Sequence, residues 1–263
     1  MNFAIILGYL ASIVVVAISL AMTLDNLWIL FDLHSIILVI GGTIALSFAC
    51  FPYGQVLKLL KVIMNDILMK KEKMTNADVV TGIVALSQAR VQGKEAFRSA
   101  SEQAKHPFLR ESAQVLAWTE ADISKDELRE MLELRANTVF ATYSQDAGIF
   151  KTLAKFPPAF GLMGTTMGMI ALLQAIGKGN SDNIGTSMSL ALLATLYGLV
   201  FANIVFLPMG EYLTKRSKDD FTLRLMIIEG IMLIHERKPT KFVEEKTKSY
   251  LLPSQRESGK KAV

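Results

Sequence analysis

The stretch FPPAFGLMGTTMGMIALLQAI, residues 156–176, decides the fold of this chain because it carries no charged side chain over its whole length. A helix of about 20 apolar residues is long enough to cross the roughly 30 Å hydrocarbon core of a bilayer. Three further apolar stretches lie at 3–24, about 35–51 and 184–207. The sequence therefore predicts an all-α, polytopic membrane protein with four transmembrane helices and a helical cytoplasmic domain.

Two of these stretches need an argument of their own. The first has neither a basic segment before it nor a small-residue cleavage site after it, so it is predicted to be a retained span and not a signal peptide. The second is short, and Asp32 and His34 stand at its start. A helix that begins near Asp32, with its polar end at the interface, would be long enough to span.

Basic residues are distributed very unevenly along the chain. Of the 28 Lys and Arg residues, 15 lie within 52–155 and 12 after residue 208, and Lys178 is the exception. Cytoplasmic loops of membrane proteins carry an excess of Lys and Arg, so both blocks are predicted to face the cytoplasm. Both termini are then cytoplasmic, and the loops at 25–34 and 177–183 lie on the other side. Because these basic residues are mixed with 21 acidic ones, no nucleic-acid partner is predicted.

The same pattern divides the chain into four parts. They are the first two transmembrane helices (1–51), a cytoplasmic helical domain (52–155), the last two transmembrane helices (156–207) and a cytoplasmic C-terminal helix and tail (208–263). Within the cytoplasmic domain, helical periodicity occurs at 56–69, 78–92, 107–120 and 125–140, without a strand or hairpin pattern.

Two helices are predicted to run between the cytoplasm and the membrane. The first has no stop signal before Pro157, and the second continues from 184 through Pro208 into an amphipathic segment at 209–235. The polar tail from about residue 238 is expected to be disordered. Cys50 is the single cysteine, so neither an internal disulfide nor a cysteine metal cluster is predicted.

None of the four stretches contains Asp, Glu, Lys, Arg or His. A proton carrier normally places a titratable side chain at mid-depth in the membrane. Either this protein moves no ions, or a partner supplies the carboxylate.

Small and hydroxyl residues recur at helical spacing in the third and fourth stretches. One strip contains Pro158, Gly161, Thr165 and Gly168, and the other contains Ala191, Thr195, Gly198 and Ala202. Small residues let helix backbones approach closely, so Gly161, Gly164, Gly168, Gly198 and Ala202 are predicted to serve helix packing. Packing alone would explain both strips. Pro158 and Pro208 each free a backbone carbonyl, which can bind a cation, act in a hinge or simply mark the interface.

Several motifs resemble those of the flagellar stator subunits of the MotA/PomA family, within the MotA/TolQ/ExbB superfamily. They are FPPAFGLMGTTMGMI (156–170), ALLATLYG (191–198), Leu-Pro (207–208), FDLHSIILVIGGT (31–43) and IIEGIMLI (227–234). The resemblance covers nearly the whole chain, in order and spacing.

By this resemblance, the expected protein is a homopentamer in the lipid bilayer of the bacterial inner membrane. It would surround two copies of a single-span partner of the MotB/PomB type, whose membrane aspartate takes up the ion, and would turn a FliG-type rotor switch protein for motility. No cofactor is implied beyond the transported Na⁺ or H⁺.

The resemblance also assigns residues to the ion pathway and to the rotor contact. Pro158, Pro208 and Thr195 match pathway positions, and Thr165 stands where sodium-driven members have threonine. A second hydroxyl gives a cation one more oxygen ligand, so Na⁺ is favoured over H⁺. Arg90 matches the rotor-facing arginine. Arg98 replaces an acidic residue that is frequent in the family, with Glu95 and Glu102 on either side, and ordinary surface charge is the alternative for all four. Residues 236–239 also depart from the family pattern, which has a glycine there.

Other classes of protein fit the sequence less well. No nucleophile triad, phosphate loop or metal-ligand spacing is present, so an enzyme is not expected. A TolQ/ExbB-type energiser of envelope processes is the main alternative, although such proteins have one span before the large loop and this chain has two. A secondary transporter would need an inverted repeat and an internal ionisable site. A passive membrane scaffold remains compatible with the small-residue strips.

Overall fold

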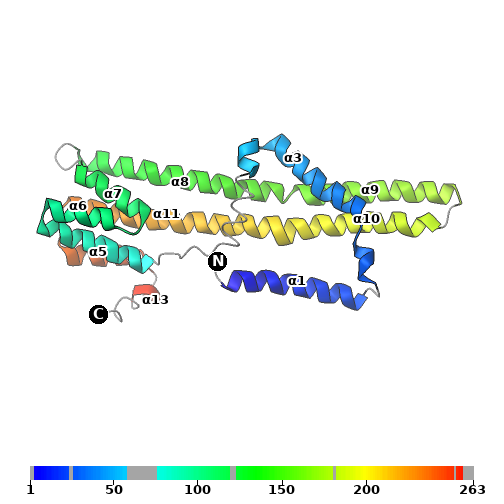
Figure 1. Cartoon of the computed structure of the whole chain (residues 1–263), viewed down its shortest axis with the longest axis horizontal. Coiled ribbons are helices and arrows are strands. Elements are labelled where there is room, and N and C mark those ends of the chain that lie inside the picture. The colour runs from blue at the N-terminus through cyan, green and yellow to red at the C-terminus, as the bar shows by residue number, and fades with distance from the viewer. Residues whose placement is uncertain are drawn as a thin grey trace. The chain divides into compact units, whose positions relative to one another are not determined.

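The structure, a computed structural model, describes residues 3–23, 26–57, 76–118, 123–179, 182–251 and 253–256. All regular elements in these ranges are helical (Figure 1). The prediction of an all-α fold is confirmed. The predicted helix at 56–69 lies almost wholly outside the described residues.

The chain forms two compact units. Unit 1 consists of residues 1–71 and 145–214, and unit 2 consists of residues 72–144 and 215–263. The predicted boundaries at residues 51, 155 and 207 concern where the membrane ends, and they stay a prediction.

Unit 1 holds the apolar helices. It contains α1 (Phe3–Thr23), the 3₁₀ turn η1 (Leu27–Leu30), α2 (Leu33–Ile36), the π-helical segment η2 (Ile37–Gly41), α3 (Gly42–Cys50), α9 (Phe156–Gly177), α10 (Asp182–Val200) and the π-helical segment η4 (Phe201–Phe206). It also contains the end of α8 (Lys125–Leu153) and the start of α11 (Leu207–His235).

Three helical runs of the described residues are long and apolar enough to cross a membrane, namely Trp28–Cys50, Lys125–Gly177 and Ile184–His235. The first predicted span corresponds to α1, which has 21 residues.

The polar residue Asp32 at the start of the second span forms a helix cap. The carboxylate of Asp32 accepts a hydrogen bond from the backbone N–H of Ser35 at 2.7 Å, and α2 begins directly after it. An Asp in this position satisfies a backbone donor that the first turn leaves without a partner. The helix therefore begins near Asp32, as predicted.

The prolines explain two irregularities that sequence periodicity did not predict. The expected continuous helix before Pro157 is interrupted, because α8 ends at Leu153 and α9 begins at Phe156, with the prolines in its first turn where their missing N–H costs least. In the other helix, η4 widens the turn directly before Pro208, and the N–H of Leu207 bonds to the carbonyl of Ala202. A proline cannot bond to the carbonyl four residues earlier, so a π segment accommodates it without ending the helix.

Unit 2 is a helical domain with its own hydrophobic core. It contains α5 (Asn76–Gln92), α6 (Lys94–Gln103), α7 (Pro107–Trp118), α12 (Thr240–Lys248), α13 (Pro253–Arg256) and the remaining parts of α8 and α11. The fully buried core residues include Phe97, Leu109, Leu116, Leu128, Leu132, Met226, Ile227 and Ile231. The IIEGIMLI motif is thus a core segment of α11.

The expectation of a disordered tail from residue 238 is wrong for residues 240–248. There the chain forms α12, in which Val243 and Thr247 are fully buried. The hydroxyl of Ser87 on α5 donates to that of Thr240 at 3.1 Å. Two buried positions separated by one helical turn give α12 an apolar face, which packs against α5.

Candidate functional site

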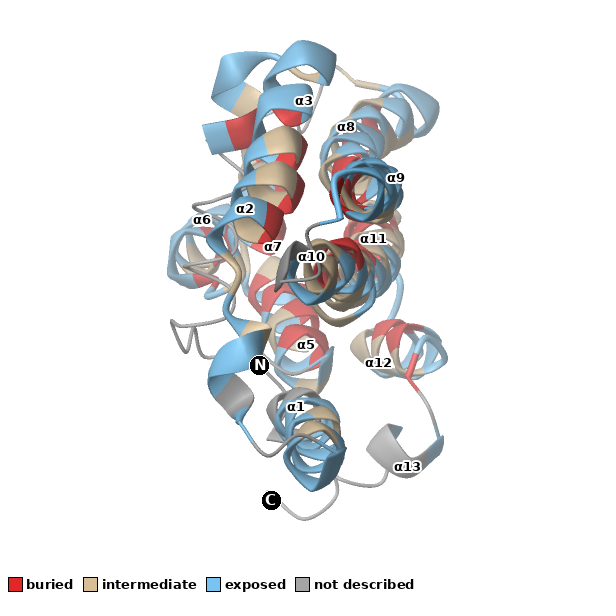
Figure 2. Ribbon diagram, turned by 90° about the vertical axis from the view of Figure 1, so that its right-hand side faces the viewer, coloured by how far each residue is buried: buried red, intermediate tan, exposed pale blue. Residues whose placement is uncertain are grey.

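The two strips of small residues lie in unit 1, where α9 packs against α10. Buried residues lie on the sides by which α2, α3, α9 and α10 approach one another (Figure 2). A Cβ added to Gly161 would lie 2.9 Å from the carbonyl oxygen of Ala194, and one added to Gly198 would lie 2.6 Å from that of Pro157. Atoms closer than about 3 Å would clash, so these glycines permit the observed approach of the two backbones.

The other predicted packing residues lie at comparable places. A Cβ on Gly164 or Gly168 would meet the Cβ of Ala194 or Ala191, respectively, at less than 3 Å. Ala202 is buried in η4. Gly42 on α3 stands against the ring of Phe160 in the same way, a contact that was not predicted.

Thr165 and Thr195 face each other across this contact. The hydroxyl of Thr165 is hydrogen-bonded to that of Thr195 and lies 3.1 Å from the carbonyl of Gly161 and 3.2 Å from that of Ala191. The Thr195 hydroxyl lies 3.3 Å and 3.5 Å from the same two carbonyls. We call these four atoms the oxygen cluster: two hydroxyl and two carbonyl oxygens, contributed by two helices.

The chemistry open to the oxygen cluster follows from its composition. Each hydroxyl has one proton to donate, so one can bond to the other while the second bonds to a carbonyl, and the cluster is satisfied without a ligand. Neutral oxygens of this kind are also ligands for alkali cations. No group of three or more His, Cys, Asp or Glu residues suited to a metal ion occurs in the described part of the chain. The cluster itself has no charge and no group that takes up a proton near neutral pH.

The two predicted pathway prolines lie away from the cluster. Pro208 follows Thr195 by 13 residues, which corresponds to about 20 Å along a helix. Pro158 precedes Thr165 by seven residues, or about 10 Å. The structure therefore brings together Thr165 and Thr195 but neither proline.

Sequence reasoning missed one anchoring residue near the site, Tyr197. Its hydroxyl donates to the carbonyl of Leu30 and accepts from the N–H of Asp32 at 3.3 Å. In addition, the hydroxyl of Ser35 donates to the carbonyl of Leu190 at 3.2 Å. These bonds fix the start of α2 against α10. The Asp-x-x-Ser spacing was a signal for the cap, but nothing local to Tyr197 identifies its partner more than 160 residues away.

The predicted rotor-contact residues lie on α5 and α6 in unit 2. Arg98 and Glu102 form an exposed i, i+4 ion pair, with an N–O distance of 3.9 Å, and Glu95 is exposed in the first turn of α6. Arg90 differs, because its guanidinium carbon lies 5.2 Å from the centre of the buried Phe97 ring. Burial, and then the charge of Arg237, lower the pKa of Arg90 below its ordinary value.

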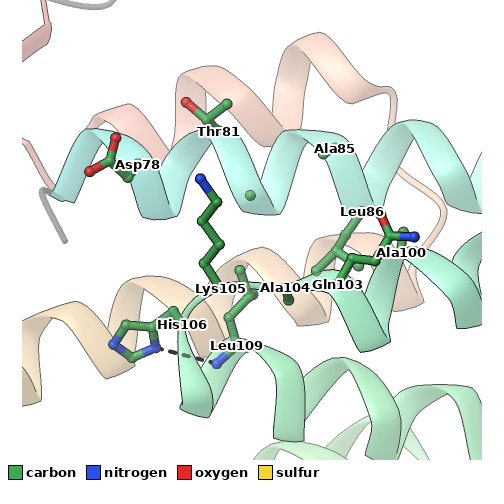
Figure 3. A pocket seen from close by; sticks show the side chains of 11 residues that line it. Asp78, Thr81, Ala85, Leu86, Ala100, Gln103, Ala104, Lys105, His106 and Leu109 are labelled. Atoms are coloured by element: carbon green, nitrogen blue, oxygen red, sulfur yellow. Dashed lines mark hydrogen bonds between the residues drawn. The ribbon is translucent and has the colours of Figure 1, made fainter.

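Unit 2 also has a cavity of about 710 Å³ that the sequence did not predict (Figure 3). Asp78 and Thr81 line it from α5, and Lys105 and His106 line it from the junction of α6 and α7. The Nδ1 atom of His106 accepts a hydrogen bond from the backbone N–H of Leu109 at 3.4 Å, so His106 caps the first turn of α7. Burial is the main cause that lowers the pKa of His106.

The chain is similar in sequence and fold to several known proteins. The model of the MotA/TolQ/ExbB proton channel family matches residues 100–225. Motility protein A of Borreliella burgdorferi is 30% identical over 260 residues, which cover 97% of this chain and 96% of that protein. Chemotaxis protein PomA of Vibrio alginolyticus is 25% identical over 95% of this chain and 96% of its own length. The structure of the flagellar MotAB stator complex from Bacillus subtilis contains a chain with a TM-score of 0.85 and 23% identity, over 96% of this chain and 97% of that chain.

Proposed function

The chain belongs to the MotA/TolQ/ExbB proton channel family and is not an enzyme, and on this premise we propose that it is a flagellar stator subunit. With a single-span partner of the MotB/PomB type, it couples inward cation flow to torque on the rotor. Its near full-length match to a Motility protein A and to PomA supports the stator role within the family.

The observation that carries the proposal is an oxygen cluster between two apolar stretches, 156–176 and 184–207, that contain no acidic residue. Its four oxygens can bind and release a cation, whereas the two stretches contain no carboxylate that could take up a proton. A partner that supplies one aspartate would complete the ion path. We therefore propose that several copies of this chain, five by resemblance, surround the partner.

In this assembly the residues have separate roles. Thr165 and Thr195 line the ion path, and Pro158 and Pro208 lie where the third and fourth spans meet the cytoplasmic interface. Both termini and unit 2 face the cytoplasm. Arg90, Glu95, Arg98 and Glu102 contact a FliG-type rotor protein, and weak, salt-screened surface charges suit a contact that forms and releases repeatedly.

We propose Na⁺ as the coupling ion in preference to H⁺. The support is the second hydroxyl of the cluster, because Thr165 adds an oxygen ligand that a relayed proton does not require.

The stator role is tested by deletion of the gene from a strain that lacks any other stator genes. Cells should assemble flagellar filaments but fail to spread in soft agar, and the wild-type gene on a plasmid should restore spreading. Normal swimming of the deletion strain would contradict the proposal.

An energiser of the TolQ/ExbB type is the alternative, because the matched family model covers those proteins as well. Accessibility tags discriminate between the two. The stator topology places 25–34 and 177–183 on the outer side of the membrane, and an outer location for only one of these loops would favour the energiser.

A further inference from the structure

A second cavity of unit 2, of about 300 Å³, lies where the end of α5 and the start of α6 meet the turn after α11. Four of its eight lining residues are basic, namely Arg90, Lys94, Arg237 and Lys238, and none of the eight is acidic. Glu236, which does not line the cavity, pairs with Lys238, with 3.5 Å between Oε2 and Nζ. An anion inside the cavity would be attracted by the basic residues that line it.

The position of Arg90 is set by packing. Its guanidinium carbon stands 5.2 Å from the ring centre of Phe97, which is fully buried. A guanidinium held over an aromatic face keeps its N–H donors in a defined plane. The lowered pKa of Arg90, caused by burial and then by Arg237, agrees with two like charges held near each other.

Arg237 occupies a backbone position that favours glycine. Its φ is 54°, and it is the single non-glycine residue with positive φ among the described residues. The N–H of Arg237 bonds to the carbonyl of Ile234 at 3.1 Å, and that of Lys238 bonds to the carbonyl of Leu233 at 3.0 Å. This is the Schellman motif at the end of α11, in which glycine avoids the strain that a side chain incurs. An arginine here costs stability, and what it adds is a cation at the cavity.

Helix dipoles account for only part of this basic cluster. Arg90 lies in the last turn of α5, and Arg237 lies two residues beyond the end of α11, where a cation is stabilised by the helix dipole. Lys94 lies in the first turn of α6, where the dipole disfavours it, and the N-cap Gly93 offers no side chain to cap that turn. An anion at this helix start would interact favourably with both Lys94 and the backbone N–H groups of the first turn.

We propose that this cavity binds the phosphoryl group of a soluble ligand, held by Arg90 and Arg237 with additional charge from Lys94 and Lys238. Two guanidinium groups suit the several oxygens of a phosphoryl group, which arginine binds in a bidentate manner. The site is a concave, partly open pocket, which fits a small soluble molecule better than a flat lipid surface. The cytoplasmic origin of the ligand rests on the proposed topology, whereas the binding itself does not.

The test is calorimetric titration of the full-length chain in detergent with inorganic pyrophosphate at constant ionic strength. The wild type should show saturable binding. Arg237→Asn should weaken binding about tenfold, because a charge-assisted contact is lost, while Arg237→Lys should retain most of the affinity. Lys241→Ala is the matched control, since Lys241 is exposed on α12 and does not line the cavity.

The substitution Arg237→Asn distinguishes a loss of affinity from a loss of folded protein. Asparagine tolerates positive φ better than arginine, so Arg237→Asn should keep or raise the unfolding temperature while affinity falls. Absence of saturable binding to the wild type, or unchanged binding by Arg237→Asn, would overturn the proposal. Binding of short-chain phosphatidic acid without binding of pyrophosphate would likewise overturn it, in favour of a lipid headgroup.

Discussion

At the scale of single residues, the hydroxyl groups of Thr165 and Thr195 join two helices and are also the proposed ligands of the ion. Their hydroxyls bond across the α9–α10 contact, and those bonds bring the carbonyls of Gly161 and Ala191 into the same cluster. A satisfied pair of hydroxyls stabilises the helix pair, and the same oxygens are possible ligands for a cation.

The role of Thr165 as an ion ligand predicts a specific change in sodium dependence. Thr165→Ala removes one cluster oxygen, so the Na⁺ concentration for half-maximal motor speed should rise about tenfold. Thr165→Ser, which keeps the hydroxyl, should stay close to the wild type. The measurement is the rotation of a bead on a flagellar stub against Na⁺ at constant proton-motive force, with equal protein levels verified. An unchanged sodium curve for Thr165→Ala would remove the argument for Na⁺.

A glycine-to-alanine substitution should affect stability differently inside and outside the α9–α10 contact. Gly168→Ala should destabilise the protein by about 1–3 kcal/mol, because the new Cβ would meet the backbone of Ala191. Gly148→Ala on α8 is the control. A Cβ there has no atom within 4 Å, so the change should stabilise by up to about 1 kcal/mol through helix propensity. Thermal unfolding in detergent measures both, and equal effects would show that the contact is looser than described.

His106 predicts how the stability of unit 2 depends on pH. Its pKa in the folded chain is lowered from 6.5, first by burial and then by Arg224, with Asp220 opposing. Below pH 6.5 the unfolded chain therefore binds a proton before the folded chain does, so stability should fall as the pH falls through this range. Protonation would also remove the Nδ1 acceptor that caps α7. In denaturant titrations between about pH 7.5 and 5.5, His106→Asn should reduce this slope, because asparagine caps helices without titrating. A slope equal to that of the wild type would show that other groups cause it.

At the scale of elements, the apolar stretches could be predicted because a membrane span is a local property of about 20 residues. The π segment η4 and the interruption at residues 154–155 could not be predicted, since they depend on how each helix accommodates its prolines. Helix α6 lacks a long apolar pattern, and only Phe97 and Ser101 are buried in it. Helix α12 is rich in charge, and its apolar face becomes evident only against α5, far away in the sequence.

Docking of α12 is tested with two neighbouring apolar residues. Val243 is fully buried in the core of unit 2, and Phe242 is 51% exposed. Val243→Ala should lower the free energy of unfolding by about 2 kcal/mol and expose the C-terminal region to limited proteolysis, whereas Phe242→Ala should cost well under 1 kcal/mol. Equal resistance of both variants to protease would mean that α12 contributes little to the core.

For the candidate site, helical spacing predicted that the hydroxyl and glycine positions share a face on each helix. Spacing could not predict that Thr165 lies opposite Thr195, because register between two helices is set by packing. Family resemblance assigned both residues to the ion pathway but did not predict that they face each other. Neither helical spacing nor family resemblance predicted the hydrogen bonds of Tyr197 to Leu30 and Asp32. These bonds join segments that are far apart in the sequence.

At the scale of the whole molecule, the two units have opposite character. Unit 1 consists mainly of apolar helices whose uncharged oxygens form the candidate ion site, and unit 2 is a helical core with charged residues on its surface. Such a division suits a protein in which one part handles the ion and the other transmits force. It also fits the absence of acidic residues from the four apolar stretches, because the proposed partner supplies the acid.

Cation flux in liposomes tests this central claim most directly. The purified chain should conduct neither Na⁺ nor H⁺ under an imposed potential, whereas the chain reconstituted with its single-span partner should conduct, and should lose conduction when the partner's membrane aspartate is neutralised. Flux through the chain alone would contradict the account.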